Sequence, residues 1–330
     1  MTAGRFVMML ALAVTGIALC CGAGASGELC LIYGDNGPGG YLGRLDEASG
    51  ELTLLTSGVE LPPFPMVSAP LVATGDPSGQ IVSYPTGSTT EFALLVATVG
   101  ASNITAAETD APVLPVGYAI IGVGLTDGDS EGVAVAWAES GSLMAVAFQP
   151  FSGKILHQVT AMMPAWYSPS VSAWTTDDDG KPVMVVQMRS GLAWQMVEVF
   201  FNGTAPRVVA QDSLGPYVAL TSGASGTVYG IVYAGGSDPV DLDFVKVVPG
   251  YTYDSPYVVT RIGKKYVSCQ PTMAVGSGSD SETVFAVCKK YAARASHLLS
   301  MNAASGQIHD PKLPFEQDRF VFGYLFSLMS

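Results

Sequence analysis

Six short turn sequences recur along this chain at an interval of about 51 residues, a spacing typical of repeat architectures. Three of them share the pattern Ser-Gly, a polar residue and an apolar residue: Ser49-Gly50-Glu51-Leu52, Ser152-Gly153-Lys154-Ile155 and Ser305-Gly306-Gln307-Ile308. The other three are centred near Gly100, Gly203 and Gly250. Each turn follows an apolar, β-branched segment and precedes another extended one, as the turn of a β-hairpin does. A hairpin repeated at a fixed interval predicts an array of similar β-sheet units.

A second series of Gly- and Asp-rich turns runs in step with the first, so each unit contains two hairpins and four strands. Residues 118–160 show the pattern clearly, with four apolar segments at 118–125, 132–138, 143–149 and 154–160. We name such strands A, B, C and D in chain order. Four-stranded antiparallel units of this length are typical of a β-propeller, in which each unit is a blade that packs against both neighbours. The sequence therefore predicts an all-β fold with six blades, and a seven-bladed ring is the alternative.

The two ends of the chain complete each other in this scheme. The first unit has strands B, C and D but no strand A, whereas Phe320–Met329 is one strand too many after the sixth unit. We therefore expect Phe320–Met329 to supply strand A of the first blade and to close the ring. The alternatives are a simple C-terminal tail or a lipid-anchor signal, whose pattern is small residues such as Ala303–Gly306, a spacer and an apolar end.

The N-terminal residues 1–25 have the features of a secretory signal peptide. They contain one positive charge, an apolar run from Phe6 to Cys21 and small residues before Ser26. The run is too short for a membrane anchor, so we expect a secreted, extracellular protein with no membrane span in its mature chain. Residues 26–330 would then form a single propeller domain. Asn103 and Asn202 begin Asn-x-Thr sequences and are predicted glycosylation sites.

Three cysteines, Cys30, Cys269 and Cys288, follow the signal peptide. An odd number in an oxidising compartment suggests one disulfide and one free thiol. Cys269 and Cys288 lie at equal distances from a turn centred between Gly278 and Ser279, so they would face each other across that hairpin. Cys30 is the competing partner, because it lies in the first blade next to the ring closure.

The charge balance excludes some partners. The chain has 28 acidic and 15 basic residues and a formal net charge of −13. This charge repels nucleic acid and anionic lipid over most of the surface. An apolar fraction of 48% provides the material for a folded core. We therefore expect a folded domain that does not bind nucleic acid.

Two acidic turns are candidate metal sites. Asp127, Asp129 and Glu131 lie in one of them, and Asp177 and Asp179 lie in the other. Both turns resemble the Asp-x-Asp-x-Asp-Gly calcium loops of integrin-type propellers, in which alternating carboxylates converge on the ion. The match is partial, because valine stands at the last ligand position of each loop. Calcium is therefore one prediction, and a solvated hairpin turn without an ion is the other.

Basic residues gather in the sixth unit, although they are sparse elsewhere. In a propeller the D-to-A and B-to-C loops share one face, and such loops commonly bind the ligand. In the sixth unit these loops carry a basic and aromatic set, which predicts an anion or sugar site: Arg261, Lys264, Lys265, Tyr266, Lys289, Lys290, Tyr291 and Arg294. The alternative is a pair of solvated loops. Trp166 and Tyr167, in a D-to-A loop on the same face, would contact a partner or else pack on their own blade.

The sequence contains no recognised catalytic motif. Its three histidines have neither the spacing of metal ligands nor a neighbouring nucleophile. The segment "LDEASGEL" at Leu45–Leu52 resembles repeats of secreted propellers of the YVTN, NHL or quinoprotein kind, which implies a fold but no activity. We therefore expect a non-enzymatic scaffold whose loops bind an extracellular protein or an anionic glycan, with no required cofactor. The alternative is a calcium-dependent propeller hydrolase of the lactonase or esterase kind.

Overall fold

A computed structural model describes residues 28–34, 40–54, 81–85, 92–97, 104–107, 114–125, 131–138, 140–149, 152–163, 168–201, 206–213, 215–223, 226–235, 241–248, 252–276, 283–291, 295–314 and 322–328. Several predicted features lie outside these residues: the signal peptide, Asn103, Asn202, Asp127, Asp129, Trp166, Tyr167 and Arg294. The part of the chain that the structure describes contains no helix long and apolar enough to span a membrane.

The described residues form β-strands that pair antiparallel with their neighbours in the chain, as the repeat predicts. One sheet has the order β23 (Phe322–Leu328), β1 (Glu28–Gly34), β2 (Gly40–Leu45) and β3 (Leu52–Leu54). A second comprises β4 (Ile81–Pro85), β5 (Phe92–Ala97) and β6 (Ile104–Ala107). A third comprises β7 (Tyr118–Leu125), β8 (Gly132–Ala138), β9 (Ser142–Phe148) and β10 (Ile155–Met162). The strands expected within residues 118–160 are therefore confirmed to within two residues.

The second half of the chain continues the pattern. One sheet comprises β11 (Ser168–Thr176), β12 (Pro182–Ser190), β13 (Ala193–Phe200) and β14 (Arg207–Asp212). The next four strands are β15 (Tyr217–Ser222), β16 (Val228–Gly235), β17 (Asp241–Val247) and β18 (Tyr257–Gly263). The following four are β19 (Tyr266–Val275), β20 (Thr283–Lys290), β21 (Ser296–Asn302) and β22 (Ile308–His309). These two groups join into one eight-stranded sheet through a single parallel bridge between Leu220 and Thr272.

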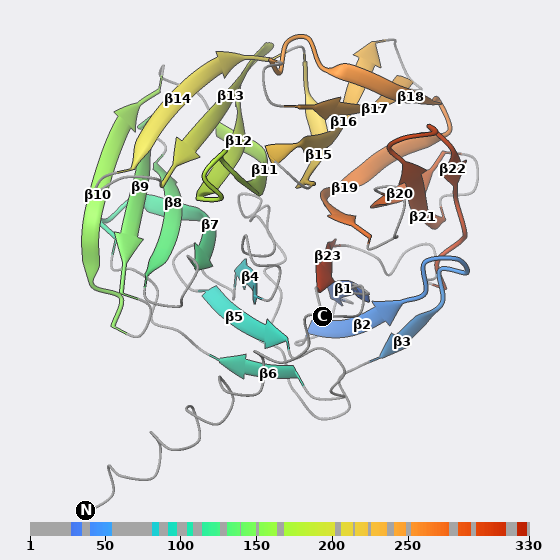
Figure 1. Ribbon diagram of the computed structural model, residues 1–330, viewed down its shortest axis with the longest axis horizontal. Coiled ribbons are helices and arrows are strands. Elements are labelled where there is room, and N and C mark those ends of the chain that lie inside the picture. Colours follow the sequence, from blue (N-terminus) through green and yellow to red (C-terminus); the bar gives the residue numbers. More distant parts are fainter. Residues whose placement is uncertain are drawn as a thin grey trace, which may run out of the picture.

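The sheets are arranged around a ring, and the strands on its inner side are β23, β4, β7, β11, β15 and β19 (Figure 1). The inner strands β11, β15, β19 and β23 contact one another in that order, and β4 contacts β7. This arrangement confirms an all-β, propeller-like fold. The count of six blades stays a prediction, because two groups share one sheet and the group of β4 has three described strands.

The ring is closed by strands from both ends of the chain. β23 pairs with β1 over seven residues, from Glu28 opposite Leu328 to Gly34 opposite Phe322. The predicted closure by Phe320–Met329 is therefore confirmed for Phe322–Leu328. Apolar packing also connects the two ends of the ring. Leu313, which follows β22, is fully buried in one cluster with Leu29 of β1 and Leu298 of β21. The first and last groups of strands thus share an apolar core.

The three Ser-Gly turns have one conformation. In the turn between β21 and β22, Gly306 N donates to Asn302 O at 2.8 Å, and Asn302 N donates to Gln307 O at 2.9 Å. The Asn302 side chain accepts from the backbone of Ser305 at 2.7 Å. The same two backbone bonds occur in the turns that end at Glu51 and Lys154. Gly50, Gly153 and Gly306 have φ of 71°, 62° and 71°, a region that favours glycine.

The core lies between adjacent sheets, because alternate residues of a strand point to opposite faces. Val133 and Val135 of β8 pack in a cluster with Val186 of β12, in the next sheet. Ala134 and Ala136, the residues between and after them, belong to a different cluster with Phe148. All four side chains are fully buried. A strand buried on both faces explains the long apolar runs that the sequence repeats.

Candidate functional site

Four strand ends of the β19–β22 group meet at one edge of the sheet, where the predicted basic loops lie. β19 begins there opposite the end of β20, with Tyr266 facing Lys290. Tyr291 N donates to Lys265 O at 2.9 Å, so the two loops touch through their backbones. β21 begins beside them, and the backbone of Lys312 pairs with that of His297 in an isolated antiparallel β-bridge. We call the following set the Asp310 edge: Lys264–Tyr266, Lys289–Tyr291, Ser296–His297 and Asp310–Lys312.

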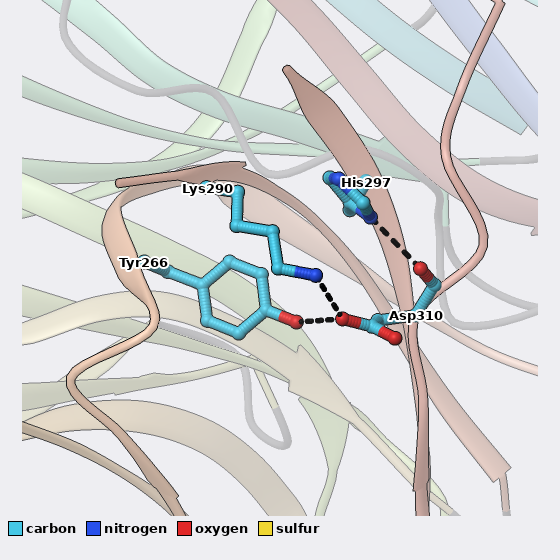
Figure 2. Close-up of polar contacts among 4 residues, drawn as sticks. All are labelled: Tyr266, Lys290, His297 and Asp310. Carbon is cyan, nitrogen blue, oxygen red and sulfur yellow. Dashed lines mark hydrogen bonds and ion pairs between the residues drawn. The ribbon is translucent and has the colours of Figure 1, made fainter. Parts of the chain in front are cut away.

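Asp310 is the centre of a polar cluster at this edge (Figure 2). The Tyr266 hydroxyl donates to Asp310 Oδ2 at 2.8 Å, and Lys290 Nζ donates to the same oxygen at 2.9 Å. His297 Nδ1 is 2.8 Å from the backbone oxygen of Asp310. Because a carbonyl oxygen can only accept, Nδ1 carries the hydrogen and donates it to this oxygen. Strands β19, β20 and β21 thus all hold the residue at which the chain leaves β22.

The electrostatics of the cluster favour a charged carboxylate beside a neutral phenol. The hydrogen bond from Lys290 lowers the pKa of Asp310, and the bond from Tyr266 lowers it further. Burial raises the pKa of Tyr266, and the neighbouring carboxylate adds to this. A carboxylate with a lowered pKa is a poor general base, and a phenol with a raised pKa is a poor nucleophile at neutral pH. The cluster is therefore suited to holding the edge in place and shaping its charge rather than to proton transfer.

The described basic residues of the predicted set fall into two groups, those paired with a carboxylate and those without such a partner. Lys290 is paired with Asp310, and Arg261 on β18 lies 3.5 Å from Asp243 Oδ1 on β17. The Asp243 side chain is 11% exposed and that of Arg261 is 69% exposed, so Arg261 covers a largely buried carboxylate. Lys264, Lys265 and Lys289 are exposed, and none has an ion-pair partner among the described residues. Among the described basic residues of the predicted patch, these three lysines are the ones that are exposed and lack an ion-pair partner.

Sequence reasoning missed the acidic residue of this edge, Asp310, and one of its lysines, Lys312. Both lie just beyond the two-residue strand β22, in "HDPK". Lys312 is exposed and adds a fourth ammonium group to the same edge. The signal that could have found them is topological, because the end of strand D and the start of strand A lie on the same side of a blade.

A second polar network organises the corresponding edge of the β11–β14 sheet. Gln187 of β12 is fully buried, and its Nε2 donates to Gly215 O at 2.8 Å. Its Oε1 accepts from the Ser170 hydroxyl at 3.0 Å, and Nε2 also reaches Ser213 Oγ at 3.3 Å. The network fixes the connection from β14 to β15 on the side where we expect the ligand. All of its amide atoms have partners, so it serves the fold.

The acidic turn of the β11–β12 hairpin is organised by its own backbone. Asp177 Oδ1 accepts from Asp179 N at 3.0 Å and from Lys181 N at 2.8 Å. Asp179 and Glu131, the other described members of the predicted metal sites, are placed without a shared ion site. Within the described ranges, no three His, Cys, Asp or Glu side chains lie together as metal ligands do. The described residues therefore do not fit a calcium centre, and calcium binding stays a prediction.

The predicted disulfide of the β19–β20 hairpin is confirmed. Cys269 and Cys288 face each other in the β19–β20 register and form a disulfide. The bond lies beside the Asp310 edge, because Tyr266 and Lys290 pair a few residues further along the same strands. A disulfide is typical of proteins that fold outside the reducing cytoplasm.

An open depression of about 660 Å³ lies near the turn between β2 and β3. Its lining includes Arg44, Asp46, Glu47 and Glu51. The carboxylate of Asp46 accepts from Ser49, whose hydroxyl and backbone N both lie 2.7 Å from Oδ1. These bonds belong to the first Ser-Gly turn, so this carboxylate is used by the fold.

Comparisons with known proteins support the fold. No protein-family profile matches the chain, and no curated protein sequence matches it. Among solved structures, a "putative 6-phosphogluconolactonase" from Bacteroides uniformis has a TM-score of 0.52 and 11% identity, covering 90% of this chain and 99% of its own. A protein of the same description from Bacteroides fragilis has a TM-score of 0.52 and 12% identity, covering 90% and 98%. TolB from Acinetobacter baumannii has a TM-score of 0.55 and 10% identity, covering 96% of this chain and 69% of its own.

This comparison corrects the leading functional prediction. The sequence favoured a non-enzymatic scaffold for a protein or an anionic glycan, and the lactonase kind was its alternative. Two of the similar structures are described by a lactonase activity, and none of the three is described as a glycan-binding scaffold. The prediction of a non-enzymatic binding scaffold is therefore wrong. It depended on the lack of recognised catalytic motifs, which is informative only for the enzyme classes that those motifs define. At these identities the likeness shows the fold alone, and that fold is a β-propeller.

Proposed function

We propose that this protein is an enzyme that hydrolyses lactones of the sugar type. The observation that carries the proposal is a shared fold over 90% of this chain with proteins described as putative 6-phosphogluconolactonases. In the reaction, water adds to the lactone carbonyl and the ring C–O bond breaks. The product is a hydroxy acid, which releases a proton when its carboxyl group ionises. The proposal includes a six-bladed ring and a secreted protein.

The chemistry of the Asp310 edge supports a product of this kind. Lys264, Lys265, Lys289 and Lys312 are exposed at one edge of a protein whose net charge is −13. Hydrolysis converts a neutral lactone group into a carboxylate, which a cluster of ammonium groups attracts. Asp310 and Tyr266 hold this edge and are not assigned a role in proton transfer. No catalytic residue is assigned within the described ranges.

The proposal is tested by measuring acid release in a pH-stat from a panel of lactones. The panel contains glucono-1,5-lactone, 6-phosphoglucono-1,5-lactone, dihydrocoumarin and an acyl-homoserine lactone. Spontaneous hydrolysis is subtracted. Each assay is run once with about 2 mM CaCl₂, a concentration about a thousandfold above a typical sensor-site Kd, and once with a chelator. We expect turnover of the sugar lactones. Rates equal to the spontaneous reaction for the whole panel, with and without calcium, would refute the proposal.

A further inference from the structure

We infer that the Asp310 edge is an anion subsite whose four exposed lysines, Lys264, Lys265, Lys289 and Lys312, bind the negative group of an acidic sugar. The ligand is a sugar acid or sugar phosphate, and the shared chemistry is a compact anionic oxygen group. The biological role of the subsite rests on the proposed lactonase function, which it deepens by naming the substrate class.

The placement of the four lysines comes from backbone pairing. Lys264 and Lys265 form the two-residue connection between β18 and β19. Lys289 lies one residue before Lys290, which pairs with Tyr266, the first residue of β19. Lys289 also pairs with Ser296 on its other side, and Ser296 O accepts from Leu313 N at 3.0 Å. The segments that carry the lysines are therefore consecutive neighbours across the end of one sheet.

Charge compensation decides which cations belong to the subsite. Lys290 is bonded to Asp310 and Arg261 is close to Asp243, so both already have a carboxylate. The remaining four ammonium groups lie on segments whose one described carboxylate, Asp310, is occupied by Lys290 and Tyr266. Asp241, at the start of β17, also lies beside Gly263, the residue before Lys264. The edge still carries more lysines than carboxylates, so it is a local region of positive charge on an acidic protein. An anionic substrate would be drawn toward this region, and the attraction would weaken with salt.

The anchoring of the edge suits a small ligand. Tyr266 is 2% exposed and its hydroxyl donates to Asp310. This contact fixes the start of β19, directly after the connection that carries Lys264 and Lys265. Tyr291 is 49% exposed beside Lys265, and an exposed aromatic ring can stack on the face of a sugar. Lysine acts as a point charge and is a common phosphate binder. Ammonium groups from several segments therefore favour a phosphate or carboxylate on a sugar ring.

The test measures binding by calorimetry with three probes: 6-phosphogluconate, gluconate and inorganic phosphate. The patch variant is Lys265→Glu with Lys289→Glu. The matched control is Lys154→Glu with Lys181→Glu, two exposed lysines in C-to-D and A-to-B turns, which lie on the opposite face. Both variants change the net charge by the same amount. Unfolding midpoints in urea establish that each variant is folded.

We expect the patch variant to bind 6-phosphogluconate at least tenfold more weakly than the wild type, and the control to stay within about twofold, since a tenfold change corresponds to one specific charged contact. Preference for 6-phosphogluconate over gluconate would identify phosphate as the bound group, and equal binding would identify the carboxylate. Equal losses in both variants, or no measurable binding of any probe to the wild type, would overturn the subsite. Lactone turnover without anion binding would remove the subsite and keep the function, whereas anion binding without turnover would do the reverse.

Discussion

Asp310 offers a direct test of the cluster at the centre of the edge. Replacing it by asparagine keeps the size of the side chain but removes its charge. The Lys290 ammonium then loses its ion pair, whereas the Tyr266 hydroxyl still has an amide oxygen as an acceptor. The variant therefore isolates the charge of Asp310 from its shape.

The size of the expected loss in stability depends on how exposed Lys290 and Asp310 are. A hydrogen bond to a charged group contributes about 1.5–3 kcal/mol when it is well shielded from water. The side chains of Lys290 and Asp310 are 32% and 38% exposed, so solvent screens much of this energy. We expect Asp310→Asn to lower the free energy of unfolding by about 1 kcal/mol at pH 7. Urea unfolding followed by tryptophan fluorescence measures the difference.

The destabilisation caused by Asp310→Asn depends on pH. Lys290 and then Tyr266 lower the pKa of Asp310 in the folded protein, so its charge stabilises the fold above the pKa of the unfolded state, which is about 4. This contribution is lost as the pH falls through the lowered folded-state pKa. The gap between wild type and Asp310→Asn is thus expected to be constant from pH 7 to about pH 5 and to close toward pH 3.

The control is Asp178→Asn, which removes an exposed carboxylate from the β11–β12 turn. We expect the free energy of unfolding of this variant to lie within about 0.5 kcal/mol of the wild-type value at pH 7, as is usual for exposed surface substitutions. Two results would refute the reasoning on Asp310. The first is an equal effect of both substitutions, and the second is a loss that stays the same from pH 7 to pH 3.

Three further predictions concern stability and are all checked by urea unfolding. Gly306→Ala should cost about 2 kcal/mol and Gly50→Ala about 1 kcal/mol, because both have φ of 71° but an added Cβ at Gly306 would lie 3.2 Å from a backbone oxygen; equal costs would contradict this. Gln187→Ala should cost about 2–3 kcal/mol, because it leaves buried hydrogen-bonding groups unpaired, and a loss under 0.5 kcal/mol would show that water replaces the amide. Cys269→Ser with Cys288→Ser should cost about 3 kcal/mol for a loop of this length; an unchanged midpoint would rule out a stabilising disulfide.

The repeat was predictable from the sequence because its turns are local structures. In each Ser-Gly turn a glycine adopts positive φ, and in two of the three turns a side chain caps a backbone N–H three residues further along. Asp46 and Asn302 both do this through Oδ1. Such requirements are written directly into a short motif. Counting the motif therefore predicted the order of the strands and the closing strand.

The disulfide was predicted correctly, although the register is less regular than assumed. Near the turn, Val275 pairs with Val284, which centres the hairpin one residue later than the midpoint of the two cysteines. Cys269 and Met273 are four positions apart in β19, whereas their partners Cys288 and Ala286 are two positions apart in β20. This bulge shifts the register and brings the cysteines opposite each other. A bulge depends on packing with neighbouring strands, so the sequence pattern alone does not place it.

The charge of the candidate site was the part that sequence proximity described least well. Six basic residues within a short stretch suggested one patch, but what matters is which carboxylates lie beside them in space. Asp243 precedes Arg261 by a whole hairpin, and Asp310 follows Lys290 by twenty residues, yet each lies within ion-pair distance of its cation. Lys312, outside the predicted set, joins the lysines that stay exposed. Because the blade brings the end of strand D beside the start of strand A, the net charge of a propeller edge has to be counted along the sheet rather than along the chain.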